Sequence, residues 1–216
     1  MSTSQKRTAL RKKREQEERR NSIVTAAREA FSEKGFTAAT MDGIADDCGL
    51  AKGTLYLYFK SKEELYVSIV LEGASLLRKD LARIADLSLP ADRLLAELLQ
   101  TYYNFYEKNQ KYFRIMFLSS QPDFRERAPE ELLKKCADEA RACMQVVSDV
   151  IAKGISSGVF RKVHPWAFAI VLWSTVNGIV MNYEQGPPYR DEILSLPLQE
   201  MLQEALDLAL NGLMSA

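Results

Sequence analysis

Residues 40–62, TMDGIADDCGLAKGTLYLYFKSK, decide the interpretation of this chain because they contain two short helical patterns separated by one turn. In the first pattern, apolar side chains recur at i, i+3, i+4 and i+7 from Met41, which is the spacing of one helix face. Gly49 supplies the turn, and the second pattern then places lysine, threonine and tyrosine close together. This combination is typical of a helix-turn-helix whose second helix enters the major groove of DNA.

The flanking sequence extends this pattern into a small helical head. Upstream, an apolar helix face runs from Ile23 to Phe31 and ends before Gly35, a residue suited to the left-handed position after a helix. Thr40 is a good N-cap for the next helix, and Ser61–Glu64 forms a capping box that begins a fourth. The order predicts three short helices with one shared apolar seam and a fourth helix that continues away from them.

Charge is unevenly distributed, although the whole chain has a net charge of zero. Residues 6–20 carry 8 basic and 3 acidic side chains, whereas residues 21–62 carry 5 of each and residues 63–216 carry 16 basic and 21 acidic. A basic N-terminal segment suits a chain that presents only its N-terminal part to a polyanion. The segment 1–20 is therefore expected to be a charged helical arm, either only solvated or touching phosphates or a minor groove beside the main site.

The rest of the chain keeps a helical periodicity, and no useful length shows the period-two alternation of strands. We expect an all-α protein with an N-terminal three-helix helix-turn-helix head and a larger helical domain. Further helices are expected at 91–108, 111–120 and 130–156, from Pro165 to Gln185 and after Pro197, with a short loop between Pro122 and Pro129.

The uncharged stretch from Pro165 to Tyr183 has nineteen residues, which is long enough to span a bilayer. Polar residues such as Asn177 lie inside it, and no basic cluster adjoins it to set an orientation. A helix buried against a partner helix accounts for it better than a membrane span. No apolar stretch typical of a secretion signal follows the basic N-terminus, so we expect a cytoplasmic protein without a membrane association.

Catalytic and metal-binding sets are not apparent. The chain has a single histidine, His164, which precedes a proline at an expected helix start and so suits a cap or surface position. Cys48, Cys136 and Cys143 have no metal-type pairing and fit reduced thiols. We therefore expect no enzyme, no metal and no cofactor.

The head resembles the DNA-binding domain of the TetR family of one-component regulators. The resemblance covers residues 36–65 and extends back over the first helix, whereas the C-terminal two-thirds resemble the family only in length and helical pattern. The matching residues are Thr40, Ile44-Ala45, Gly49, Gly53-Thr54-Leu55-Tyr56, Tyr58-Phe59 and Lys62-Glu63-Glu64-Leu65, preceded by Ala26-Ala27, Ala30-Phe31 and Gly35-Phe36.

This resemblance implies a set of DNA contacts at the recognition helix and at the start of the helix before it. One position departs from the pattern, because Ala51 stands where the family commonly has a hydroxyl cap. Half-buried packing remains the alternative role for Tyr56 and Tyr58. The implied DNA-contacting residues are Thr40, Met41, Lys52, Gly53, Thr54, Tyr56, Tyr58 and Lys62.

The family also implies an effector cavity in the rear domain, which is rich in aromatic residues. The same aromatics suit a plain core equally well. The helices after His164 and Pro197 offer the faces for a four-helix dimer interface. Our expected cavity lining is Tyr103, Tyr106, Phe113, Phe117, Trp173 and Asn177, and our expected interface is Ser174, Gly178, Met201, Ala205 and Leu208.

The sequence thus predicts a homodimeric regulator that represses transcription from a near-palindromic operator and is released by a small apolar or aromatic effector. Its expected parts are an arm at 1–20, a DNA-binding domain at 21–67 and an effector-binding and dimerisation domain at 68–216. The alternatives are an activator of the same family, or a helical small-molecule-binding protein with a vestigial head.

Overall fold

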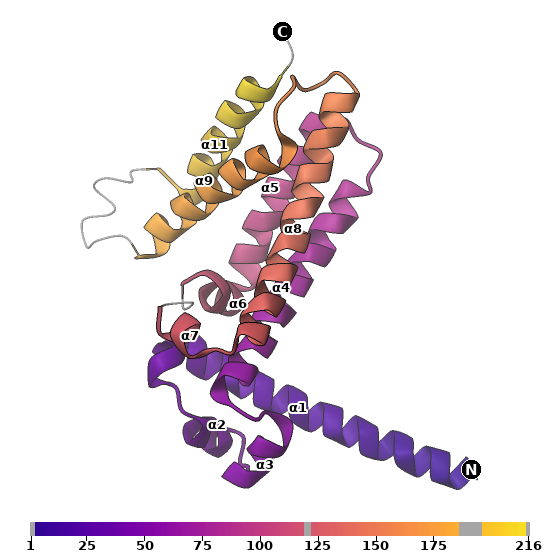
Figure 1. The fold of residues 1–216 in the computed structure, drawn as a ribbon, viewed down its shortest axis with the longest axis vertical. Helices are drawn as coiled ribbons and strands as arrows, with labels where there is room; N and C mark the ends of the chain where they lie inside the picture. The colour runs from indigo at the N-terminus through magenta and orange to yellow at the C-terminus, as the bar shows by residue number, and fades with distance from the viewer. Residues whose placement is uncertain (1–2, 119–121, 186–195, 215–216) are drawn as a thin grey trace. The chain divides into compact units, whose positions relative to one another are not determined.

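The computed structural model describes residues 3–118, 122–185 and 196–214, and these are mostly helical (Figure 1). The described residues contain one isolated β-bridge, between Phe160 and Met214, and no longer strand, so the predicted all-α class is confirmed. The elements are α1 (Thr3–Ala38), α2 (Met41–Asp47), α3 (Lys52–Tyr58), α4 (Lys62–Ala85), α5 (Ala91–Lys108), α6 (Gln110–Phe113), the π-helical turn η1 (Arg114–Leu118), α7 (Pro122–Arg127), α8 (Glu130–Ser156), α9 (Pro165–Gln185) and α11 (Leu198–Leu213).

The chain divides into two compact units. The first comprises Met1–Gly73 and Gln110–Cys136, and the second comprises Ala74–Asn109 and Ala137–Ala216. The division falls inside α4 and α8, which each contribute to both units. The expected boundary between residues 67 and 68 stays a prediction.

In the first unit, α1 joins the basic segment and the first helix of the head in one element. The part of α1 nearest the N-terminus extends past α2 and α3 (Figure 1), and the side chains of residues 7–22 are all exposed. Gly35 lies at φ 75°, so the regular helix is interrupted at the predicted residue. Without a Cβ, glycine adopts this left-handed conformation at little cost.

Aromatic rings form the core of the first unit. The ring of Tyr66 on α4 lies 5.1 Å from those of both Phe31 and Phe36 and 4.8 Å from that of Phe124. Tyr66 is fully buried and its hydroxyl donates to the carbonyl oxygen of Ile115 at 2.7 Å, so its polar atom is satisfied inside the core.

Two expectations for residues 111–129 are wrong. The predicted loop between Pro122 and Pro129 contains the helix α7. Pro122 is its first residue, a position that proline tolerates, and the buried ring of Phe124 packs against Tyr66. The predicted helix at 111–120 is divided into α6 and η1, and its last two residues lie outside the described residues.

At Gly73, an added Cβ would lie 2.7 Å from the Met116 sulfur, so glycine permits close packing between α4 and η1 there.

In the second unit, α5 buries an apolar face and α11 packs against both α9 and α5. The helix α8 ends at Ser156, close to the predicted Ser157-Gly158, and the ring of Phe160 fills the space in which a side chain at residue 154 would lie. His164 caps α9 as expected, since its Nδ1 accepts from the N–H of Ala167 at 3.3 Å. The second unit is thus a helical body distinct from the head.

Candidate nucleic-acid interface

The turn between α2 and α3 has the geometry that its sequence predicts. The hydroxyl of Thr40 caps α2 by accepting from the N–H of Gly43 at 3.1 Å. At the other end, Gly49 has φ 63°, its N–H bonds to Asp46 O and the N–H of Leu50 bonds to Ala45 O, both at 2.9 Å. This pair of bonds is a Schellman motif, which ends α2 and directs the chain into α3.

One face of α3 is fixed in the core and the opposite face is open. Leu55 is completely buried, and Phe59, just after the helix, is 2% exposed. Residues two positions before and after Leu55 lie on the other side of the helix, and these are Gly53 and Leu57, both exposed. An added Cβ at Gly53 would meet no atom within 4 Å. The outward face of α3 is therefore not covered by the first unit.

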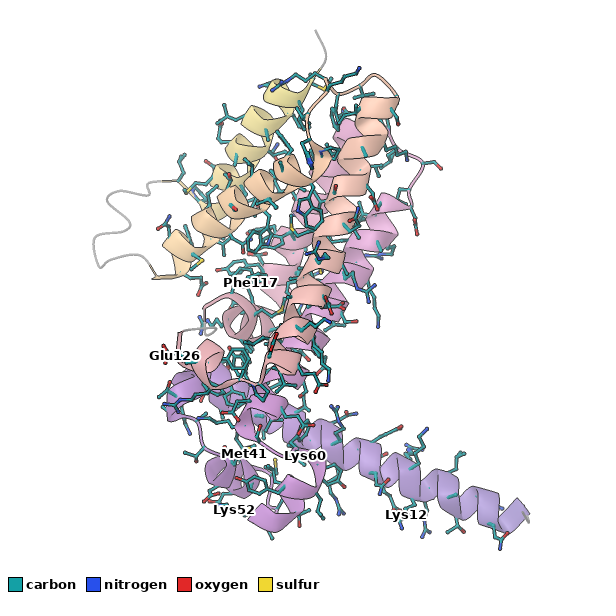
Figure 2. The ribbon with its side chains drawn as sticks, in the orientation of Figure 1. Lys12, Met41, Lys52, Lys60, Phe117 and Glu126 are labelled. Carbon is teal, nitrogen blue, oxygen red and sulfur yellow. The ribbon has the colours of Figure 1, made fainter. Side chains whose placement is uncertain are left out.

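The predicted DNA-contacting residues differ in their accessibility. Figure 2 shows Lys52 at the outer edge of the head, on the side of α2 and α3. The side chain of Met41 is only 7% exposed, so a contact from this residue would have to use its main chain. Of the full set, Thr40, Lys52, Gly53 and Tyr56 are exposed, Thr54, Tyr58 and Lys62 are half-buried, and Met41 is buried.

Lys52 already has an anionic partner. Its ammonium lies 2.6 Å from a carboxylate oxygen of Asp42 on α2, and both side chains are more than half exposed. The hydrogen bond with Asp42 raises the pKa of Lys52, so the group stays cationic. A base or phosphate oxygen must compete with this carboxylate, and no local sequence pattern indicates this pairing.

Lys62 is turned inward. Its ammonium donates to the carbonyl oxygens of Phe36 at 2.7 Å and Ala39 at 2.9 Å, and it lies 4.5 Å from the centre of the Phe36 ring. Burial lowers the pKa of Lys62, while the charge of Glu63 opposes this shift and the charge of Arg127 adds to it. In this arrangement Lys62 fixes the segment between α1 and α2, and its contact with DNA stays a prediction.

The start of α3 and the arm each add one feature. Ala51 occupies the N-cap position of α3 without a side-chain hydrogen bond, as its residue type predicts. At the base of the arm, the guanidinium of Arg20 lies 4.9 Å from the centre of the Phe59 ring, next to the end of α3. The base of the arm thus makes a cation–π contact with the residue that follows α3.

The expected effector-lining residues belong to both units. In the second unit, Asn177 is bonded to Tyr102 and not to the expected lining residue Tyr103. The Tyr102 hydroxyl donates to the amide oxygen of Asn177 at 2.7 Å. Tyr106 is buried and bonded to Glu184, whereas Trp173 is 43% exposed. Tyr103 is half-buried, and its hydroxyl is bonded to Glu107.

The other two expected lining residues, Phe113 and Phe117, lie in the first unit, with ring centres 4.7 Å apart. The cavity stays a prediction.

The expected dimer-interface residues include three that line an open apolar groove between α9 and α11. The groove has a volume of about 540 Å³ and includes Met201, Ala205 and the 72% exposed Leu208. Ser174 is exposed and Gly178 half-buried on α9, where an added Cβ at residue 178 would meet no atom within 4 Å. Three of the five expected interface residues therefore line an open apolar groove, and the dimer itself stays a prediction.

Among the described residues, one helical segment, Pro165–Glu184, has the length and composition of a membrane span. Only 28% of the apolar stretch of this helix is buried inside this chain.

Acidic, histidine and cysteine side chains form no group of three or more suited to a metal within the described ranges. Cys48, Cys136 and Cys143 are free and half-buried. Burial raises the pKa of the Cys143 thiol to about 11, so the group is protonated and weakly nucleophilic at neutral pH.

Two sequence-family models match the chain. That of the bacterial regulatory proteins of the tetR family matches residues 23–69, and that of the tetracyclin repressor-like C-terminal domain matches residues 95–207. The second match alone covers more than half of the 216 residues. Together the two models cover the head and most of the chain that follows it.

Individual relatives are also regulators by name. The HTH-type transcriptional regulator YhgD of Bacillus subtilis (strain 168) is 26% identical over 179 residues, which are 82% of this chain and 91% of that protein. The HTH-type transcriptional activator FasR of Mycolicibacterium smegmatis is 29% identical over 137 residues, 63% of this chain and 60% of its own length.

Solved structures share the fold. FadR of Bacillus subtilis, in complex with stearoyl-CoA, aligns with a TM-score of 0.74 at 20% identity, covering 88% of this chain and 97% of that one. PfmR of Thermus thermophilus, described as a TetR family transcriptional regulator, aligns with a TM-score of 0.70 at 24% identity, covering 89% and 99%.

Proposed function

Since this chain belongs to the TetR family of bacterial transcriptional regulators, we propose that it is a homodimeric cytoplasmic repressor that binds a near-palindromic operator and leaves it when a small effector binds. The observation that carries the DNA-binding part is the uncovered face of α3, which lies opposite the fully buried Leu55 and beside Lys52 and Tyr56. Lysine can donate to guanine O6 and N7 in the major groove, and a tyrosine hydroxyl can bond to phosphate.

The basic arm adds sequence-independent attraction. Residues 6–20 carry most of the basic side chains of residues 1–62, and their described side chains are exposed. Each phosphate that they neutralise releases counterions, so binding weakens as salt rises. Their attraction acts on any DNA sequence, whereas the side chains of α3 distinguish one sequence from another.

The groove between α9 and α11 supports the homodimer, because its apolar lining includes Leu208, a large side chain that this chain leaves 72% exposed. A dimer presents two heads, and the spacing of the two half-sites has to match the spacing of those heads. A two-fold axis therefore explains why we expect a near-palindrome.

The effector is proposed to be an apolar or aromatic compound. FadR was solved with stearoyl-CoA, so long-chain acyl-CoA thioesters join the apolar and aromatic compounds to be tried. Release requires that the effector prefer a conformation with low DNA affinity, and a shift from 99:1 to 1:99 takes about 5.5 kcal/mol of differential affinity. Because one relative, FasR, is named an activator, activation is the second candidate.

The experiment is a selection followed by a titration. The full chain selects duplexes from a random library at low salt, and fluorescence anisotropy then measures affinity for a selected and a scrambled duplex, with and without stearoyl-CoA and an aromatic compound set. Specific enrichment supports the DNA-binding function, and release by a compound supports effector control. A chain that binds a compound but enriches no sequence and shows no salt-dependent DNA binding would instead support a small-molecule-binding protein with a vestigial head.

A further inference from the structure

We propose that Leu57 contacts the C5-methyl group of a thymine in each operator half-site and so contributes to sequence specificity. This inference rests on the DNA-binding function proposed above. Leu57 is 84% exposed, the highest value among the large apolar side chains that the structure describes. Its apolar surface is therefore available to a partner rather than used in the core of this chain.

The position of Leu57 on α3 directs it away from the protein. At about 100° per residue, Leu57 lies roughly 200° from the buried Leu55, on the opposite side of the helix. Gly53 lies four residues earlier on that same side and has no side chain, with open space where a Cβ would be. The helix can therefore approach a surface closely along this line, and Leu57 is the large side chain that meets it.

The neighbours of Leu57 indicate a nucleic-acid surface as the occupant. Lys52 and Tyr56 are exposed near it on the same short helix, and the basic residues 6–20 belong to the same unit. Although Asp42 pairs with Lys52, the lysine, the tyrosine hydroxyl and the basic side chains of the arm together are complementary to a polyanion and not to an apolar protein groove. The exposed leucine then needs an apolar group within the DNA itself.

The major groove offers such a group. Its base edges present hydrogen-bond donors and acceptors that leucine cannot use, and thymine adds the C5-methyl, which apolar side chains contact. Uracil lacks only this methyl. Loss of one buried methyl group should weaken binding roughly fourfold per half-site, which corresponds to ~0.8 kcal/mol.

The experiment uses the duplex selected by the full-length protein from a random library. Each thymine of that duplex is replaced by uracil, one symmetric pair at a time, and affinities are measured for the wild type, Leu57→Ala and Leu57→Met. Leu87→Ala is the matched control, because Leu87 is an exposed leucine of the second unit. Leu57 is so exposed that Leu57→Ala is not expected to disturb folding.

We expect one thymine pair at which uracil weakens wild-type binding about 15-fold, for two methyl groups. That loss should persist in Leu57→Met and Leu87→Ala and disappear in Leu57→Ala. Equal sensitivity of the wild type and Leu57→Ala at every position would overturn the role of Leu57 and leave the DNA-binding function intact. Failure to select any duplex would overturn both.

Discussion

The ion pair between Asp42 and Lys52 leads to a prediction that distinguishes a DNA-reading lysine from a structural one. The Lys52 ammonium lies 2.6 Å from the Asp42 carboxylate, and the two side chains are 58% and 60% exposed. If Lys52 binds a base or phosphate, it must give up or share this partner, and the carboxylate itself repels the phosphates. Replacing Asp42 by Asn should therefore strengthen operator binding.

The size of the effect follows from the exposure of the pair. Exposed ion pairs contribute little, so freeing Lys52 should improve affinity only about two- to fivefold. Replacing Lys52 by Ala should weaken specific binding roughly 5- to 150-fold. In the double variant, the gain from Asp42→Asn should shrink, because no lysine is left to release.

The assay is an anisotropy titration of the selected duplex with the four proteins of this double-mutant cycle, at two salt concentrations. Asp80→Asn is the matched control, because Asp80 is an acidic residue of the second unit that also pairs with a basic neighbour, Arg83. If Asp42→Asn gains equally with and without Lys52, the benefit comes from general charge removal. An unchanged affinity for both single variants would show that neither Lys52 nor Asp42 contributes to DNA binding.

Three further predictions concern other parts of the chain. Deleting residues 1–20 should weaken DNA binding and flatten the dependence of log affinity on log salt, and an unchanged slope in titrations would show that the arm makes no phosphate contacts. Replacing the fully buried Leu55 by Ala should lower the free energy of unfolding by about 2–5 kcal/mol in urea denaturation, and a change below ~0.5 kcal/mol would contradict its core position. Replacing Leu208 by Glu should convert a dimer into a monomer in light scattering, with Leu87→Glu as the control; a dimer that persists would place the interface elsewhere.

The head was predictable from sequence because its signals are local. The Thr40 cap, the turn at Gly49 and the missing cap at Ala51 each depend on a few neighbouring residues, and the structure contains all three. The buried Leu55 and Phe59 likewise follow from helix periodicity. Local chemistry is thus sufficient to identify a helix-turn-helix.

Features that depend on distant partners were not predictable in the same way. The helix α7 forms where prolines indicate a loop, and its Phe124 packs against Tyr66, which is far away in sequence. Lys62 matches a family position for DNA contact, yet its ammonium donates to the carbonyl groups of Phe36 and Ala39, at and just after the end of α1. Similarly, no sequence pattern assigns Asp42 to Lys52, because the pairing depends on how α2 and α3 pack.

If the outward face of α3 recognises a DNA sequence, the protein must bind the selected duplex more tightly than the scrambled one, and the ratio of the two affinities measures this preference. For the wild type this ratio should reach about 1,000 or more. Lys52→Ala should reduce the ratio roughly 5- to 150-fold, while Lys79→Ala, at an exposed lysine of the second unit, should leave it unchanged. A wild-type ratio near one, or a ratio that Lys52→Ala does not change, would show that this face of α3 does not read the sequence.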